Sequence, residues 1–230
     1  MLKTENVTKC FRGVKANNSI SLEAKRGEVS LLLGLNGAGK STFIKCICGL
    51  LKFDGKILVG GKDCRSLEAK RVIGYIPETP ALYDYLTVDE HLDFIERAYK
   101  CKNPALRQQL LDRFELADKK QKLAKELSKG MQQKLSICCA LLHEPELIIF
   151  DEPMVGLDPL AIKTLKSIFE ELKNEDKAVL ISTHILDSVE NCWDKAYILS
   201  LGELKAEMAS DEDGKSLEEM FFAVTGVEDK

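Results

Sequence analysis

Hydrophobic residues follow two different patterns along this chain. Toward both ends they form short continuous runs, at residues 29–33, 72–76, 147–150 and 178–181. Uniform apolarity over so short a length is typical of parallel strands that are buried on both faces. These runs therefore predict the strands of a central, mostly parallel sheet.

The first part of the chain also reads as rich in β-strands. Residues 2–7 read as a strand, and residues 19–23 alternate between apolar and polar positions. Residues 55–59 end in the pair Gly60-Gly61, which favours a tight hairpin. We therefore expect several strands, among them one hairpin, in the first part of the chain. A second hairpin is expected at residues 196–207.

From about residue 80 the apolar spacing becomes helical. Thr87 and Glu90 form a capping box, and Asn103-Pro104 is a second helix start because proline is tolerated at the first helical position. Ser128 opens a third helix within residues 123–142. The sequence thus predicts a helical insertion between two parts that contain strands.

The pattern after the insertion alternates between strand and helix. Helices are expected at residues 160–174 and 185–192, on either side of the strand at 178–181. Residues 211–214 read as a solvated acidic link, and a short amphipathic helix follows from Leu217. The fold class predicted is α/β.

A glycine-rich stretch at residues 34–42, with the sequence GLNGAGKST, lies between the run at 29–33 and a helix. In this context the spacing G-x-x-x-x-G-K-S predicts a phosphate-binding loop, whose backbone N–H groups and helix start attract phosphate. Lys40 would reach the β- and γ-phosphates, Ser41 would bind Mg²⁺, and Thr42 would contact a phosphate. The alternative is a glycine turn capped by a helix. The nucleotide contacts predicted here are Asn36, Gly37, Ala38, Gly39, Lys40, Ser41 and Thr42.

Two carboxylates, Asp151 and Glu152, close the apolar run at 147–150. A carboxylate at the end of a strand neighbouring the phosphate-loop strand can hold Mg²⁺ through water. Glu152 would then face the attacking water as general base. The alternative is a pair of surface acids at a strand end.

The length, net charge and cysteine content of the chain limit the classes of function that it can have. The 230 residues suffice for one core with a small satellite unit, and a net charge of −4 argues against a nucleic-acid binder. The eight cysteines include no C-x-x-C pair, so we expect reduced, mostly buried thiols in the cytosol. No apolar run reaches the ~18 residues that cross a bilayer, so a membrane role requires a partner.

Residues 127–133, LSKGMQQ, resemble the signature motif of the ATP-binding subunits of ABC transporters. The order of phosphate loop, signature, Asp-Glu strand, Gly156-Leu157-Asp158 and His184 matches the family along essentially the whole chain. The resemblance implies a P-loop NTPase core, with an antiparallel β subdomain and an α-helical insert. The implied division is a core at 1–79 and 143–207, a helical subdomain at 80–142, and a tail at 208–230.

The resemblance also implies an assembly of two subunits, head to tail, around two Mg-ATP molecules. Ser128 and Gly130 of one subunit would complete the ATP site of the other, since a helix N-terminus suits a γ-phosphate. Asp158 would lie at the subunit interface, and His184 would contact the γ-phosphate. Phe11 takes the position of the aromatic that stacks on adenine; the alternative is an ordinary packing aromatic.

Two residues depart from the family pattern. Glu78 stands where the family usually has a glutamine that reaches the metal and the attacking water and senses the membrane partner. It keeps an oxygen ligand but adds charge near Mg²⁺. Lys129 replaces the first glycine of the signature. Neither change touches Lys40, Asp151 or Glu152, so hydrolysis is expected to survive.

The resemblance implies a transport ATPase on the inner face of the cell membrane, bound to a permease subunit. Glu78 and the tail sequence at 216–221 are similar to separately encoded bacterial exporters. Tyr83 and Tyr85 would suit contact with the membrane subunit, with core packing as the alternative. Two other functions stay open: a soluble ATPase acting on nucleic acid or ribosomes, and a regulatory module that binds ATP without turnover. Cargo is not specified by the sequence.

Overall fold

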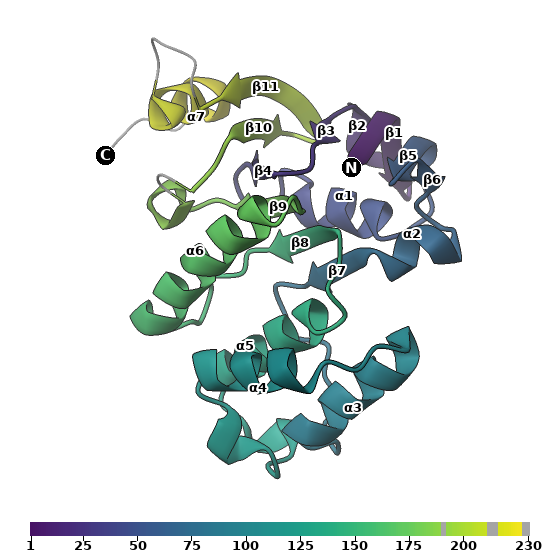
Figure 1. Ribbon diagram of the computed structural model, residues 1–230. Coiled ribbons are helices and arrows are strands. Elements are labelled where there is room, and N and C mark those ends of the chain that lie inside the picture. Colours follow the sequence, from purple (N-terminus) through teal and green to yellow (C-terminus); the bar gives the residue numbers. More distant parts are fainter. Residues whose placement is uncertain (190–191, 211–215, 227–230) are drawn as a thin grey trace.

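The structure, a computed structural model, describes residues 1–189, 192–210 and 216–226. Figure 1 shows a central sheet, a smaller sheet beside the N-terminus, and a group of helices beyond one edge of the central sheet. The predicted acidic link at 211–214 lies outside the described residues.

The central sheet has the strand order β11-β10-β4-β9-β8-β7. Strands β10, β4, β9, β8 and β7 pair in parallel, and β11 is antiparallel to β10. This confirms the mostly parallel sheet that the apolar runs predicted and the hairpin near the C-terminus. The strands are β4 (Glu28–Leu33), β7 (Ile73–Ile76), β8 (Leu147–Asp151), β9 (Ala178–Thr183), β10 (Lys195–Ser200) and β11 (Glu203–Ala209).

The smaller sheet is antiparallel, with the order β2-β1-β5-β6 and β3 paired with β1. Gly60 and Gly61 have φ of 56° and 76°, the left-handed conformations that a two-residue hairpin turn requires. The predicted hairpin is confirmed. The strands are β1 (Leu2–Phe11), β2 (Val14–Ile20), β3 (Glu23–Ala24), β5 (Asp54–Val59) and β6 (Lys62–Asp63).

Helices cover both faces of the central sheet. Alternate strand residues face opposite sides: Leu31 and Leu33 belong to the core that contains helix α6, and Leu32 to the core that contains α1. Helices α3, α4 and α5 stand together beyond the β7 edge (Figure 1). The helices are α1 (Lys40–Ile47), α2 (Leu67–Arg71), α3 (Val88–Tyr99), α4 (Pro104–Arg113), α5 (Lys129–Leu141), α6 (Pro159–Asn174) and α7 (Leu217–Thr225).

The predicted helix starts are confirmed. Thr87 and Glu90 make the capping box of α3, Asn103 caps α4, and the Ser128 hydroxyl accepts a hydrogen bond from the Met131 N–H at the start of α5. Short 3-10 turns occur at Ala117–Lys119 and Ala124–Glu126.

The helix expected at 185–192 is wrong in extent. The structure has only a 3-10 turn, Leu186–Val189, and residues 190–191 lie outside the described chain. The Thr183 hydroxyl accepts a hydrogen bond from the Ile185 N–H, at 3.1 Å, so a local side-chain turn precedes the 3-10 segment.

The cysteines of the described residues are free thiols, as predicted. Cys46, Cys48, Cys64 and Cys138 are buried, and Cys10 is exposed. None of the helices in the described ranges is both long and apolar enough to span a membrane.

Candidate nucleotide-binding site

The phosphate loop connects the end of β4 to the first turn of α1. Gly37 and Gly39 have φ of 84° and 104°, which side chains rarely adopt. A Cβ atom on Gly34 would lie 2.5 Å from the Leu199 carbonyl oxygen, so only glycine fits beside β10. Gly39 gives α1 no side-chain cap, which suits a helix start that receives an anion.

A cavity of about 540 Å³ lies against this loop. The predicted loop residues line it on one side, and Glu78, Glu152 and His184 line it on another. The structure therefore brings together residues that are far apart in the sequence. The loop residues that line the cavity are Asn36, Gly37, Ala38, Gly39, Lys40, Ser41 and Thr42.

Lys40 points back into its own loop. Its Nζ donates to the Gly34 carbonyl oxygen at 2.6 Å and lies 3.1 Å from Oε1 of Glu152. The side chains of Lys40 and Glu152 are each only 6% exposed, so this ion pair is largely shielded from water. These two contacts hold the Lys40 ammonium at the wall of the cavity, next to the Glu152 carboxylate.

Asp151 is held by two hydroxyl groups. The Ser41 hydroxyl donates to its Oδ1 at 3.1 Å, and the Ser182 hydroxyl donates to the same oxygen at 2.6 Å. Burial raises the pKa of Asp151, these two hydrogen bonds oppose the rise, and the charges of Glu152 and Glu78 add to it.

The expectation that the strand ending in Asp151 is adjacent to the phosphate-loop strand is wrong. The strand of Asp151, β8, does not neighbour the phosphate-loop strand β4, because β9 lies between them. Ser182, on the intervening strand β9, donates a hydrogen bond from its hydroxyl to Oδ1 of Asp151. Asp151 still reaches Ser41 because the carboxyl ends of the three parallel strands lie at one edge of the sheet.

Glu152 has a constrained backbone and two side-chain partners. Its φ of 49° is in the left-handed region, and its N–H lies 3.1 Å from both the carbonyl oxygen and the hydroxyl of Ser182. Nδ1 of His184 lies 3.0 Å from Oε2. Because a strained residue held by neighbours on all sides is typical of functional sites, the geometry suits a positioned base.

The donor set fits a magnesium ion that also binds phosphate. Among the described residues no three His, Cys, Asp or Glu side chains are grouped to hold a metal by themselves. Mg²⁺ in phosphate-transfer sites takes one or two protein oxygens together with phosphates and water. The Ser41 hydroxyl and the Asp151 carboxylate, 3.1 Å apart beside the phosphate loop, supply such oxygens. Glu78 lines the same cavity with its side chain exposed.

Four predicted residues lie away from this cavity. Phe11, at the end of β1, is 45% exposed and has the Lys9 ammonium 4.7 Å from its ring. Ser128 and Gly130 begin α5, where a Cβ atom on Gly130 would lie 2.7 Å from the Gly156 carbonyl oxygen. Asp158 caps α6 and pairs with Lys134 of α5 at 2.8 Å.

Sequence reasoning missed two buried residues at the site. Ser182 contacts both Asp151 and Glu152, and its only signal was a polar residue inside an apolar strand. Asn17 is fully buried, and its amide donates to the Gly39 carbonyl oxygen at 3.1 Å. It lies on β2, twenty-two positions before the loop that it supports, so spacing gave no signal.

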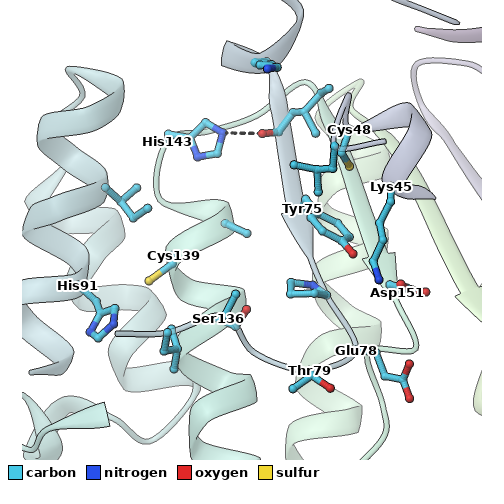
Figure 2. Close-up of a pocket in the computed structure, with 18 of the residues that line it drawn as sticks. Lys45, Cys48, Tyr75, Glu78, Thr79, His91, Ser136, Cys139, His143 and Asp151 are labelled. Atoms are coloured by element: carbon cyan, nitrogen blue, oxygen red, sulfur yellow. Dashed lines mark hydrogen bonds between the residues drawn. The ribbon is translucent and has the colours of Figure 1, made fainter. Parts of the chain in front are cut away.

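A second cavity, of about 730 Å³, lies between β7 and helices α3 and α5 (Figure 2). Ser41 and Glu78 line both cavities. Tyr83, at its rim, is 58% exposed, and the nearby Tyr85 is 75% exposed. Core packing of these two tyrosines, the alternative left open by the sequence, is therefore excluded.

Comparison with known proteins gives one consistent family. Residues 17–155 match the family described as ABC transporter. The ABC-type transporter ATP-binding protein EcsA of Bacillus subtilis is 39% identical over 212 residues, covering 90% of this chain and 86% of EcsA. An ABC transporter ATP-binding protein of Methanocaldococcus jannaschii is 35% identical over 206 residues, covering 88% of this chain and 75% of that protein.

Solved structures agree. One described as the ATP binding subunit of an ABC transporter has a TM-score of 0.92 and 37% identity, covering 98% of this chain and 99% of its own. A solved ATP-binding cassette of an ABC transporter in its ADP conformation has a TM-score of 0.76 and 29% identity. The match covers 97% of this chain and 94% of that structure's chain. These similarities confirm the predicted P-loop NTPase fold.

Proposed function

The chain belongs to the ABC transporter family, as an ATP-binding subunit, and from this premise we propose that it binds and hydrolyses Mg-ATP at the 34–42 loop. The observation that carries the proposal is the convergence of Lys40, Ser41, Asp151, Glu152 and His184 on one edge of the parallel sheet. A solved relative in its ADP conformation shares the fold and supports a nucleotide as the ligand.

Each of these residues has a role that suits its surroundings. Lys40 and the loop N–H groups bind the phosphates, and Thr42 adds a hydroxyl. Ser41, Asp151 and Glu78 face Mg²⁺, which when bound neutralises charge on the phosphates. Glu152 removes a proton from the attacking water, and His184 holds the Glu152 carboxylate and contacts the terminal phosphate.

We assign three of the residues outside the cavity, Ser128, Gly130 and Asp158, to the interface with a second copy of the chain. Ser128 and Gly130 stand at the start of α5, where a helix N-terminus suits phosphate. They do not line the cavity of their own chain, so a partner's nucleotide is the ligand that they fit. Asp158 forms an ion pair with Lys134 of the same helix α5, and it would face the same interface. Phe11, exposed on β1, would stack on adenine.

In this proposal, ATP hydrolysis drives transport by a separate membrane permease. Binding to the permease would hold the protein at the inner face of the cell membrane. Exposed aromatic residues at the 730 Å³ cavity, among them Tyr83, support a protein contact there. The division into a core at 1–79 and 143–207, a helical subdomain at 80–142 and a tail at 208–230 belongs to this proposal. The export direction rests on similarity at Glu78 and in the tail.

The test is the substitution Glu152→Gln, which keeps the size of the side chain but removes the base. ATP turnover should fall about 100- to 10,000-fold while nucleotide binding persists. With Mg-ATP the variant should form dimers, measured by light scattering. Glu170→Gln, an exposed change on α6, serves as control and should leave turnover unchanged. Turnover by Glu152→Gln at the wild-type rate would refute the assigned base.

The two other functions make different predictions. A regulatory module without turnover would show no phosphate release from wild-type protein in a single-turnover assay with Mg-ATP. A nucleic-acid ATPase would shift RNA or DNA at near-physiological salt, with affinity falling steeply as salt rises. The net charge of −4 disfavours this second function.

A further inference from the structure

The hydroxyl group of Tyr75 has no hydrogen-bond partner within the described chain, although its oxygen is buried. Tyr75 lies on β7 and lines the 730 Å³ cavity together with Ser41, Glu78 and Asp151. A buried donor without an acceptor is costly, so such groups in native proteins usually bind water or a ligand.

Strand register places Tyr75 and Asp151 on the same face of the sheet. Tyr75 of β7 pairs with Ile149 of β8, and Asp151 follows Ile149 by two residues. Side chains two residues apart on a strand project from one face, so Tyr75 and Asp151 are diagonal neighbours. Figure 2 shows the hydroxyl of Tyr75 directed toward the part of the cavity where the side chains of Lys45 and Asp151 end.

One carboxylate oxygen of Asp151 accepts no hydrogen bond from the described residues. Both hydroxyls that contact it, from Ser41 and Ser182, donate to Oδ1. Oδ2 receives no hydrogen bond from any residue in the described ranges. Burial raises the pKa of Tyr75, and the negative charge of Asp151 raises it further. The phenol therefore stays protonated and can only be a donor toward a carboxylate.

We propose that Tyr75 is a positioning residue of the metal site, whose hydroxyl donates through a cavity water to Oδ2 of Asp151. The two side chains make no direct hydrogen bond, and a cavity of about 730 Å³ has room for water between them. Tyr75 thereby keeps the carboxylate oriented for the cation that Ser41 also faces. This inference rests on the proposed function, because it requires Mg-ATP at the 34–42 loop.

The test compares Tyr75→Phe with wild-type protein. A fluorescent, slowly hydrolysed ATP analogue is titrated in excess MgCl₂ and again in EDTA, and the ratio of the two affinities measures the contribution of the metal. The ratio should fall about three- to tenfold in Tyr75→Phe, the effect of one hydrogen bond. Affinity in EDTA should change less than about twofold, since the hydroxyl acts only on the metal-binding oxygens.

Tyr99→Phe is the matched control. Tyr99 lines the same cavity, but its ring stacks on His143 at 3.8 Å, on another wall. Its affinity ratio should equal that of wild type. The thermal midpoint of Tyr75→Phe without nucleotide should also match wild type, because the hydroxyl makes no direct hydrogen bond to a described residue.

Three results would overturn the role of Tyr75: an unchanged ratio, an equal fall in Tyr99→Phe, or an equal loss of affinity in EDTA. Wild-type protein that binds the analogue in neither condition would overturn the proposed function itself, and the role of Tyr75 with it. Binding by wild type with an unchanged ratio in Tyr75→Phe overturns the inference alone.

Discussion

Asp151 shows how a residue can be stabilised in position and still destabilise the fold. Its carboxylate is only 1% exposed, and its pKa is raised chiefly by burial. A folded-state pKa above the unfolded one means that ionised Asp151 costs stability at neutral pH. The cost disappears below about pH 4, where both states are protonated.

Asp151→Asn should therefore raise stability while it removes the carboxylate to which we assign metal binding. Without nucleotide, we expect the free energy of unfolding at neutral pH to rise by about 0.5–2 kcal/mol, as is common when a functional residue is replaced. The gain should shrink as the pH falls toward about 4. Urea unfolding measures both. A loss of stability at neutral pH would contradict the prediction.

Residues of the site differ in how far the sequence reveals them. Lys40, Ser41, Asp151 and Glu152 belong to contiguous motifs, because a loop that binds phosphate needs neighbouring residues. Ser182 reaches the site through pairing of β8 with β9. Such a residue gives no local pattern, since its importance comes from contact between distant strands.

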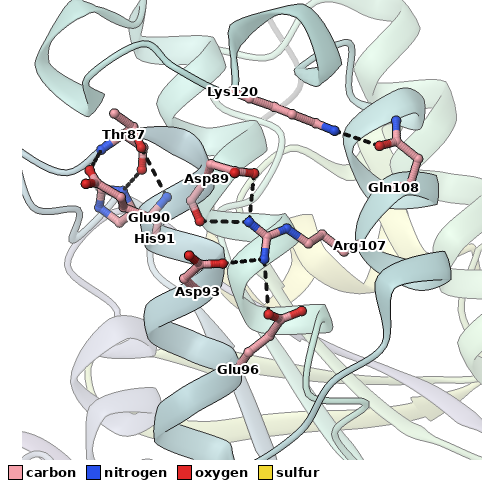
Figure 3. A network of polar contacts seen from close by, with 9 residues as sticks. All are labelled: Thr87, Asp89, Glu90, His91, Asp93, Glu96, Arg107, Gln108 and Lys120. Atoms are coloured by element: carbon pink, nitrogen blue, oxygen red, sulfur yellow. Dashed lines mark hydrogen bonds and ion pairs between the residues drawn. The ribbon is translucent and has the colours of Figure 1, made fainter.

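At the scale of elements, helix α4 is joined to α3 by one arginine. Arg107 donates to the carboxylates of Asp89, Asp93 and Glu96 and also to the Asp89 carbonyl oxygen (Figure 3). Its side chain is 16% exposed, so these ion pairs are less screened than surface pairs. Loss of the cation would leave three acids of α3 close together.

Arg107→Gln should lower the free energy of unfolding by about 1–3 kcal/mol, because the carboxylates lose their charged partner. Arg97→Gln removes an exposed arginine of α3 that takes no part in this network, and should change stability by less than about 0.5 kcal/mol. Urea unfolding compares the two. Equal effects would show that net charge, and not the network, is responsible.

Helix starts were predicted well because their signals are local. Thr87, Asn103 and Ser128 each cap the helix that follows within three residues. The helix expected after His184 is a 3-10 turn instead, and no local signal in the sequence distinguishes the two. Capping residues mark where a helix begins. The type and length of a short turn, in contrast, are known only from the structure.

At the scale of the whole molecule, the C-terminal helix α7 folds back onto the central sheet. It contacts β10 and β11, and Phe221 is 3% exposed within the main core. The sequence predicted an amphipathic helix here but not its docking site. Strand order likewise came only from the structure, because apolar runs identify strands without saying which are neighbours.

Phe221→Ala should cost about 3–5 kcal/mol of stability, the usual effect of removing a buried aromatic ring. Glu218→Ala, an exposed change on the same helix, should change stability by less than about 0.5 kcal/mol. Thermal and urea unfolding report both. A negligible effect of Phe221→Ala would show that the helix contributes little to the folded core.

Helix α5 is fastened to the segment before α6 at two points. Gly130 approaches Gly156 so closely that a methyl group would not fit, and Lys134 holds Asp158 one turn farther along. A displacement of helices α3, α4 and α5 would therefore also move this segment, which directly follows Glu152 in the chain. Through this segment, such a displacement would change the position of the Glu152 carboxylate, to which we assign the role of base.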